Sequence, residues 1–384
     1  MRSAAIFSFS DLNNPEMWEF GIIARNLLAG IGFQHTAIIN NVPSAYMPPG
    51  LPYIYYFFFM IFSDNSFGYI MILFLNVIIS SFSVLIIYIV SNNIYNKNTA
   101  LLSAAYASFS PVYIYSAVIF SPVVYYHLFS SLCFLYFLRS YNSNGNPDSK
   151  TPLRYSTLLS VSLGLFLYIR AEILILIFIL FLLYIIKKQV YNALLILCIP
   201  LIIISPWTIR NYIVFGKIIP VTTSAGYNFY TGHGDAVTTI EYNRRVNSLT
   251  EDSSFEIKKS DIGYETAFKY IKEDPAEDLR ESLSRIADLW IFDRYRESTA
   301  NPLYLIPWLL TLLLFVFGYY YSLKDKIISS KLLYLKIYII FVTLLVIVFF
   351  NIPRYQVQVS FIMIPTAMYA VNILFSKAKG KVKV

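Results

Sequence analysis

Residues 16–33 read E-M-W-E-F-G-I-I-A-R-N-L-L-A-G-I-G-F and are followed, after a polar loop, by Y-M-P-P-G at 46–50. This stretch precedes a chain of 384 residues that is 57% hydrophobic and only 14% charged. A soluble domain usually carries about 25% charged residues, so the composition indicates a polytopic membrane protein. Function is therefore to be sought in the few polar groups at the ends of the spans, and this stretch carries two carboxylates.

Glu16 and Glu19 are three residues apart, so a helix would project both carboxylates from one face. Asn14 is suited to the N-cap of that helix and Pro15 to its first position. The apolar residues that follow predict an amphipathic helix lying along the membrane interface. A second interpretation of the pair stays open, because glutamates also stabilise a helix N-terminus by about 0.3–1 kcal/mol each.

Nine apolar segments are candidates for membrane-spanning helices, which need about 20 residues each. They are 67–90, 99–120, 123–138, 155–169, 173–186, 190–204, 303–321, 332–350 and 357–375. The run 155–186 is too long for one crossing and is interrupted by Arg170 and Glu172. Because charges are costly inside a bilayer, we expect two short helices with this pair at the turn between them. Residues 51–63 are too few for a span and predict an interfacial or re-entrant helix.

The positive-inside rule assigns the sides of the membrane. Basic residues at Lys97, 139–154, 187–188, 324–336 and 377–383 alternate along the nine spans and predict cytoplasmic loops. The +8 net charge is thus explained by topology, and no nucleic-acid partner is expected. An N-terminus placed outside without a preceding span suggests a missing upstream helix, of which 1–10 would be the last turns.

The resulting organisation has five parts. They are a first extracytoplasmic loop at 1–66, membrane helices at 67–205, an extracytoplasmic loop at 206–302, membrane helices at 303–376 and a basic cytoplasmic tail at 377–384. The large loop shows helical periodicity over 258–290, broken at Pro275, which predicts a pair of surface helices.

Acidic residues are distributed unevenly. Fifteen of the 22 lie in the loop 206–302, and the others are Asp11, Glu16, Glu19, Asp64, Asp148, Glu172 and Asp325. There is no acid between Asp64 and Asp148. Carboxylate chemistry at the outer face therefore has few candidates outside the large loop, and Glu16 and Glu19 are prominent among them.

Three arginines stand at outer ends of predicted spans: Arg170, Arg210 in S-P-W-T-I-R-N, and Arg354. A planar guanidinium suits two-point contact with phosphate, so these residues would form an anion site if they converge. Two simpler interpretations stay open: pairing of Arg170 with Glu172, and contact of the other side chains with lipid headgroups.

The remaining candidates for metal or redox chemistry are weak. His35, His127 and His233 are scattered and lack the spacing of zinc ligands. Cys133 and Cys198 lie within apolar runs and are expected to be small buried residues. No metal site is therefore predicted and no cofactor is certain, although a divalent cation is left open.

Short motifs, in the same order along nearly the whole chain, resemble the C-type membrane glycosyltransferases. This group includes the lipid A aminoarabinose transferases and the protein O-mannosyltransferases, and the chain is most similar to its family-39-like members. The motifs are Glu16-Met-Trp-Glu19-Phe20 with Ile23-Ala24, Asn26, Gly30 and Gly32; Tyr46-Met-Pro-Pro-Gly50; Tyr168-Ile-Arg-Ala-Glu172; Ser205-Pro-Trp-Thr-Ile-Arg-Asn211 with 216–228; the segment 270–290; and Arg354-Tyr355.

The resemblance implies an all-α membrane protein of GT-C type in the cell membrane. It implies transfer of a sugar from a polyprenyl-phosphate donor to a glycan, lipid or protein acceptor at the extracytoplasmic face, with inversion. Glu16 and Glu19 stand at the family's acidic positions, where an acid activates the acceptor hydroxyl. Arg170, Arg210 and Arg354 would bind the donor phosphate, with Arg170 preferred. Tyr46 and Tyr355 would contact the substrates.

Two departures from the family pattern matter. The family commonly has a second acid after the span 99–120, where this chain reads Phe120-Ser-Pro-Val, and the family's first membrane helix is absent. A shortened, non-catalytic homologue is therefore one alternative. A transporter or flippase of lipid-linked glycans is the other, although such a protein would favour mid-span charges and inverted repeats, and few mid-span charges and no repeat are found.

Overall fold

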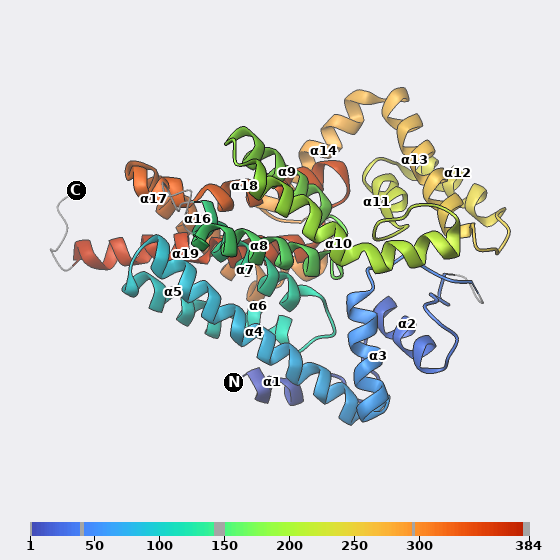
Figure 1. The fold of residues 1–384 in the computed structure, drawn as a ribbon, viewed down its shortest axis with the longest axis horizontal. Helices are drawn as coiled ribbons and strands as arrows, with labels where there is room; N and C mark the ends of the chain where they lie inside the picture. The colour runs from blue at the N-terminus through green and yellow to red at the C-terminus, as the bar shows by residue number, and fades with distance from the viewer. Residues whose placement is uncertain (1, 39–41, 142–149, 294–295, 379–384) are drawn as a thin grey trace.

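The computed structural model describes residues 2–38, 42–141, 150–293 and 296–378 (Figure 1). Within these ranges the chain forms nineteen α-helices and no strand. The prediction of an all-α fold is confirmed. Asp148 and the last part of the predicted basic tail, residues 379–384, lie outside the described residues.

The nine predicted spans correspond to a bundle of apolar helices. In chain order these are α4 (Ser66–Ile94), α5 (Lys97–Phe109), α6 (Pro111–Ala117), α7 (Val123–Tyr141), α8 (Lys150–Leu167), α9 (Ile173–Ile186), α10 (Val190–Phe215), α16 (Pro302–Lys324), α18 (Leu333–Val348) and α19 (Pro353–Ala378). Four of them, α4, α10, α16 and α19, are long and apolar enough to cross a membrane.

Helix α19 lies at the centre of this bundle, against α16, α5, α7 and α4. Every residue from Tyr355 to Met368 is buried, so no face of the helix at this level is left to lipid. Polar side chains on this stretch find partners inside the protein, as buried polar groups must. Gln356 donates from Nε2 to the carbonyl oxygens of Asp288 and Leu289 at 3.1 and 2.6 Å.

The outside of the bundle is apolar. Large side chains such as Phe82, Phe178, Ile202 and Leu313 are each more than half exposed. A continuous apolar surface of this kind is unsuited to water and suited to lipid. Together with the four long apolar helices, it identifies a multi-pass membrane protein.

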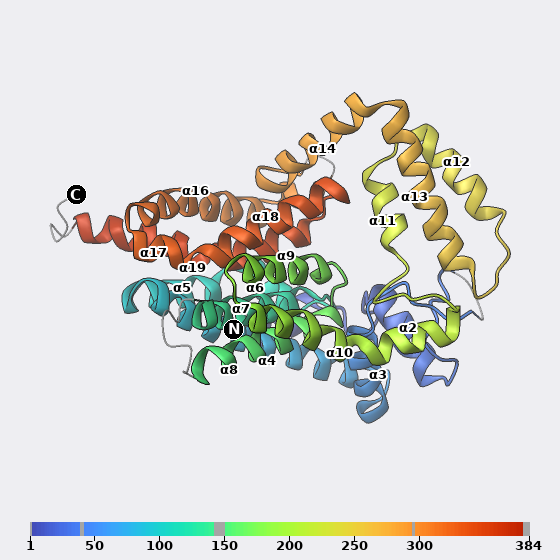
Figure 2. The same ribbon diagram turned by 45° about the horizontal axis from the view of Figure 1, so that its top comes forward.

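The shorter helices lie at the ends of the bundle, except α1, which packs along its side against α4 and α6 (Figure 1). They are α1 (Arg2–Phe9), α2 (Trp18–Leu28), α3 (Gly50–Phe62), α11 (Ala225–Gly232), α12 (Ala236–Asn247), α13 (Phe255–Glu273), α14 (Pro275–Trp290), α15 (Glu297–Ala300) and α17 (Lys326–Lys331). Helices α2, α3, α11, α12 and α13 gather at one end, and α17 and the end of α19 lie at the other (Figures 1 and 2). The two loops predicted to share a face therefore share one end of the bundle.

Two predicted interruptions are confirmed. The run 155–186 is divided into α8 and α9, with Arg170 and Glu172 in the turn between them. The surface helices of the large loop are α13 and α14, and Pro275 begins the second, with the Asp274 side chain accepting from the Glu277 N–H at the N-cap. The short segment after Pro48-Pro49 is also helical, as α3, and packs on α2 and α4.

Two predicted spans have different bounds. The segment 99–120 is divided into α5 and α6, because Ser110 precedes a proline and adopts an extended conformation (ψ 126°). Helix α10 does not end at Ile204, as predicted, but continues to Phe215, and the following Gly216 adopts a left-handed conformation (φ 66°). Pro206 leaves the Ile202 carbonyl without its helical partner, and the Ser205 hydroxyl donates to that oxygen at 2.8 Å.

The predicted start of the first-loop helix is wrong. Helix α2 begins at Trp18, and Met17, not Asn14, is its N-cap. The backbone N–H groups of Asn13 and Asn14 donate to the Asp11 carboxylate at 2.9 and 3.0 Å, so this local turn takes the place of a helical turn. The expectation for the cysteines is also wrong in part, since Cys133 is buried but Cys198 is exposed on the bundle surface.

Candidate active site

Glu16 and Glu19 lie on a sharp turn at the loop end of the bundle. Glu16 is exposed and precedes α2, whereas Glu19 is half-buried in the first turn of the helix. The two carboxylates therefore do not share a helical face, contrary to the prediction. Between them Trp18 has a φ of 53°, a left-handed conformation that costs a non-glycine residue about 1–3 kcal/mol. Strain of this size is often retained where the backbone orients functional groups.

The first loop is held in place by what we call the loop clamp: Glu256, Arg210, Ser44, Ala45 and Thr223. The buried Glu256 carboxylate accepts from Ser44 Oγ at 2.5 Å, from the Ala45 N–H at 2.9 Å and from Thr223 Oγ1 at 2.7 Å. Arg210 Nη1 donates to the Ser44 carbonyl at 2.8 Å, and the Thr223 N–H donates to the Ala45 carbonyl at 2.9 Å. The clamp joins α10 and α13 to the first loop.

The Y-M-P-P-G motif contacts the Y-I-R-A-E motif directly. The Gly50 N–H donates to the Tyr168 carbonyl at 2.7 Å. A Cβ atom at Gly50 would lie 2.6 Å from that oxygen, so only glycine fits here. Two motifs more than a hundred residues apart in the sequence thus meet beside Arg170.

Arg170 is the centre of what we call the arginine cluster: Arg170, Glu172, Gln358, Tyr126, Tyr355 and Arg354. Its side chain is 3% exposed. Nε lies 3.3 Å from Glu172 Oε2, and Nη1 donates to Gln358 Oε1. The guanidinium carbon lies 4.9 and 4.4 Å from the ring centres of Tyr126 and Tyr355.

One nitrogen of this buried guanidinium, Nη2, has no hydrogen-bond partner among the described residues. A buried, unsatisfied donor on a charged group costs free energy, so such an atom usually indicates a missing ligand or water. The predicted pairing of Arg170 with Glu172 is present. This pair uses Nε of Arg170, so Nη2 can still donate a hydrogen bond to a ligand.

Arg354 is half-buried beside this group, next to Tyr355 in the sequence. Its guanidinium carbon lies 5.3 Å from the ring centre of Trp18. No ion pair or hydrogen bond to its side chain occurs within the part of the chain that the structure describes. Since Trp18 is adjacent to Glu19, the contact places the acidic turn of the first loop beside the arginine cluster.

Arg210 has a different environment. Besides Ser44, its Nη1 donates to Asn211 Oδ1 at 3.1 Å, and Nη2 lies 3.5 Å from the Phe33 carbonyl. Its guanidinium also lies 4.8 Å from the Trp207 ring centre. The structure therefore brings Arg170 and Arg354 together and places Arg210 in the loop clamp.

Tyr46 packs against the rings of His35 and Tyr227, with centroids 5.6 and 6.4 Å away, and Lys259 lies over the two tyrosines. The Lys259 ammonium lies 5.5 and 5.1 Å from the ring centres of Tyr46 and Tyr227. Burial lowers the pKa of Lys259, and the Glu256 carboxylate opposes that shift. Burial also lowers the pKa of His35, and the Glu19 carboxylate opposes it. Glu19 is thus near enough to act electrostatically on this group.

The second predicted substrate residue, Tyr355, is buried within the arginine cluster. Its hydroxyl donates to Glu172 Oε1 at 3.4 Å, and its ring packs on Arg170. Its observed contacts orient the Arg170–Glu172 pair, while Tyr46 is partly accessible.

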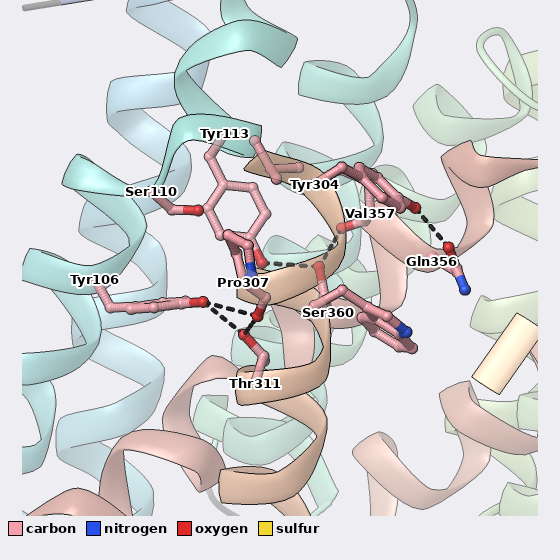
Figure 3. Close-up of a pocket in the computed structure, with 11 residues that line it drawn as sticks. Tyr106, Ser110, Tyr113, Tyr304, Pro307, Thr311, Gln356, Val357 and Ser360 are labelled. Carbon is pink, nitrogen blue, oxygen red and sulfur yellow. Dashed lines mark hydrogen bonds between the residues drawn. The ribbon is translucent and has the colours of Figure 1, made fainter. Parts of the chain in front are cut away.

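A small cavity between α5, α6, α16 and α19 is no candidate for a sugar (Figure 3). Its hydroxyl groups pair with neighbouring groups, as in Tyr106–Thr311 at 2.6 Å and Tyr113–Ser360 at 2.8 Å. The cavity has a volume of about 10 Å³, enough for a single water molecule.

Sequence patterns did not identify several of these residues. Glu256 and Lys259 are two of many charged residues on an ordinary amphipathic helix, and Gln358 is one of two amides in the predicted span 357–375. Their roles depend on contacts with residues far away in the chain. For the divalent cation, the described residues contain no group of three or more His, Cys, Asp or Glu side chains that could hold a metal.

This fold and part of this sequence are similar to those of known proteins. Residues 46–209, a little under half of the chain, match the family described as dolichyl-phosphate-mannose-protein mannosyltransferase. The oligosaccharyltransferase of Archaeoglobus fulgidus matches with a TM-score of 0.60 at 12% identity, over 98% of this chain and 47% of that one. A weaker similarity, with a TM-score of 0.47 at 9% identity over 99% and 76% of the chains, links it to ArnT from Cupriavidus metallidurans. No curated protein sequence matches.

The chain therefore has the GT-C fold of the membrane glycosyltransferases, and the resemblance predicted from its motifs is confirmed. It spans about half the length of the archaeal oligosaccharyltransferases that it matches. The matched family segment runs from Tyr46 to Ile209, so it includes the Gly50–Tyr168 contact and Arg170.

Proposed function

We propose that this protein transfers a sugar from a polyprenyl-phosphate donor to an acceptor at the loop end of the bundle. The observation that carries the proposal is the pair Arg170 and Arg354: among the described residues, the buried Arg170 guanidinium has a free donor and Arg354 has no anionic partner. The archaeal oligosaccharyltransferase has been solved with a dolichol-phosphate, and its fold is shared by this chain. That precedent supports a lipid phosphate as the group these arginines bind.

The chemistry of transfer agrees with this arrangement. When the bond between the anomeric carbon and the donor phosphate breaks, negative charge develops on the leaving phosphate. Arginines placed in a partly buried site before reaction stabilise such charge at little reorganisation cost. Arg170 Nη2 would make one hydrogen bond to the phosphate, and Arg354 would supply the second charge.

A base is needed on the opposite side of the sugar to accept the proton of the attacking acceptor group. Glu19 is our first candidate, because it is half-buried and next to the Trp18–Arg354 contact. Glu16 precedes the strained Trp18 and is exposed, so it is the second candidate. Tyr46 would contact the acceptor, Tyr355 would hold Arg170 in position, and Arg210 would hold the first loop.

The positive-inside pattern supports an extracytoplasmic face for this end of the bundle, and the cell membrane as the location. The acceptor would be a glycan, lipid or protein. A divalent cation would have to use ligands from the substrates as well as from the chain, since no three-residue ligand group is formed by the described residues.

The test is an assay in proteoliposomes that measures release of polyprenyl phosphate from a polyprenyl-phosphate sugar. We expect Glu19→Gln to lower the rate by roughly 10²- to 10⁴-fold, the usual contribution of a general base. Glu273→Gln, a change of an exposed glutamate on α13, is the matched control and should have no effect.

Full activity in both Glu19→Gln and Glu16→Gln would overturn the assignment of the base. Movement of intact donor across the bilayer without release of polyprenyl phosphate would instead identify a flippase. If wild-type protein shows neither activity although the donor binds, the chain is a non-catalytic homologue.

A further inference from the structure

The end of the bundle opposite the candidate active site has a hollow of about 380 Å³ that we call the lysine pocket. Three lysines from three different helix ends line it: Lys187 after α9, Lys326 at the start of α17 and Lys336 in the first turns of α18. Lys187 is more than a hundred residues from the other two, so the fold brings three lysines to one hollow. Ser329 and Tyr141 also line it.

These ammonium groups have no carboxylate partner among the described residues. Lys336 Nζ lies 3.4 Å from both the carbonyl and the hydroxyl of Ser329, and Lys187 lies 5.7 Å from the Tyr141 ring centre. The acid nearest in sequence is Asp325, and its Oδ1 accepts from the N–H groups of Ile327 and Ile328 at 2.8 and 3.1 Å. Three cations at one hollow, with no anion beside them among the described residues, leave a site for a negatively charged ligand.

Exposed apolar side chains lie at the pocket and next to it. Leu323 lines the pocket and is 47% exposed. Ile186 and Ile327 are adjacent in sequence to Lys187 and Lys326 and are 76% and 69% exposed. The apolar outer surfaces of α9 and α16 extend to this pocket. A soluble phosphate compound would gain nothing from exposed aliphatic side chains, whereas a lipid would cover them with its acyl chains.

We propose that the lysine pocket binds the phosphate of an anionic phospholipid, with the acyl chains along the exposed apolar faces of α9 and α16. Basic residues gathered between helix ends at a membrane surface are suited to anionic headgroups. The site is distinct from the arginine cluster, and the inference does not rest on the proposed sugar transfer.

The experiment is native mass spectrometry of the full chain in a neutral detergent, titrated in separate arms with phosphatidylglycerol, phosphatidylcholine and inorganic phosphate. We expect saturable binding of phosphatidylglycerol and much weaker binding of the other two. The double variant Lys187→Gln/Lys336→Gln should bind phosphatidylglycerol roughly 25-fold more weakly, from about fivefold for each lysine.

The matched control is Lys217→Gln/Lys258→Gln, which removes two lysines at the opposite end, each paired there with an aspartate. It should retain wild-type affinity. Lys187→Arg/Lys336→Arg should restore binding, which separates loss of charge from misfolding. An equal loss in the control, no loss in the glutamine variant, or inorganic phosphate binding as tightly as the lipid would overturn the proposal.

Discussion

The loop clamp and the arginine cluster both bury charged groups at the same end of the bundle, but they differ in how completely these groups are paired. In the clamp both Glu256 oxygens accept hydrogen bonds, and Arg210 donates to backbone oxygens. In the cluster a buried Arg170 nitrogen lacks a partner and Arg354 has no anion among the described residues. A buried charge whose hydrogen bonds are all made within the protein stabilises the fold, whereas a buried charge with a free donor indicates a binding site for a ligand.

The largest expected effect tests the cluster. Arg170→Lys keeps the charge but removes the planar fork, so phosphate can no longer be bound in the same geometry. We expect donor turnover to fall by roughly 10²- to 10³-fold, the size seen when one preorganised donor is lost. The measurement is the initial rate of polyprenyl phosphate release.

Arg139→Lys provides the control for that change. Arg139 also packs on a tyrosine, at 5.2 Å from the Tyr155 ring centre, and donates to its hydroxyl at 3.2 Å, but it lies at the end of α7. It should leave turnover unchanged. Equal losses in the two variants would mean that arginine–tyrosine packing, and not phosphate binding, explains the effect.

The second effect tests the clamp. Glu256→Gln removes the charge that three donors share, so the free energy of unfolding should fall by about 2–3 kcal/mol. The measurement is the unfolding temperature in detergent, with Glu251→Gln, an exposed neighbour, as the control. An unchanged unfolding temperature would contradict a structural role for Glu256.

The third effect sharpens the contrast between Arg354 and Arg210. Because Arg354 has no hydrogen-bond acceptor in the part of the chain that the structure describes, Arg354→Gln should leave the unfolding temperature unchanged. It should raise the KM for the donor about tenfold, equivalent to about 1.4 kcal/mol. Arg210→Gln should have the opposite pattern: it should lower the unfolding temperature and leave the KM for the donor almost unchanged. Arg244→Gln, an exposed arginine on α12, is the control for both. The contrast fails if both variants lower the unfolding temperature equally.

The smallest effect concerns His35, whose pKa is lowered by burial. Below about pH 6.5 the unfolded chain binds a proton that the folded chain resists, so stability should fall as the pH drops through and below that value. Above it both states are neutral at His35 and no dependence arises from this residue. Unfolding temperatures between pH 7.5 and 5.5 should decline less in His35→Gln than in wild type, and equal slopes would remove His35 from the explanation.

The helices could be predicted from the sequence because an apolar run of sufficient length has few alternatives to a membrane helix. The break at Arg170 and Glu172 could also be predicted, because charges are costly inside a bilayer. The continuation of α10 past Pro206 could not be predicted, since it depends on the Ser205 hydroxyl replacing a lost backbone donor. The start of α2 depends similarly on Asp11 capturing the N–H groups of Asn13 and Asn14.

The candidate site was predictable only in part. Arg170, Arg354 and Glu19 stand in motifs that resemble those of the C-type membrane glycosyltransferases, and that resemblance implies a common site. The contact that joins them, Arg354 on Trp18, connects residues more than three hundred positions apart and has no signal in a single sequence. The separation of Arg210 from the other two arginines likewise follows from the Ser44 carbonyl, a backbone atom that no residue pattern specifies.

Glu256 and Lys259 are three residues apart on α13, so the tie to the first loop and the ammonium beside Tyr46 belong to one helical turn. A rigid turn cannot shift one of these groups without the other. Any displacement of this turn would therefore shift the Ser44–Ala45 segment of the first loop and the ammonium beside Tyr46 together. The space available to an acceptor at Tyr46 would then depend on the first loop and α13 jointly, although the two segments are about two hundred residues apart in the sequence.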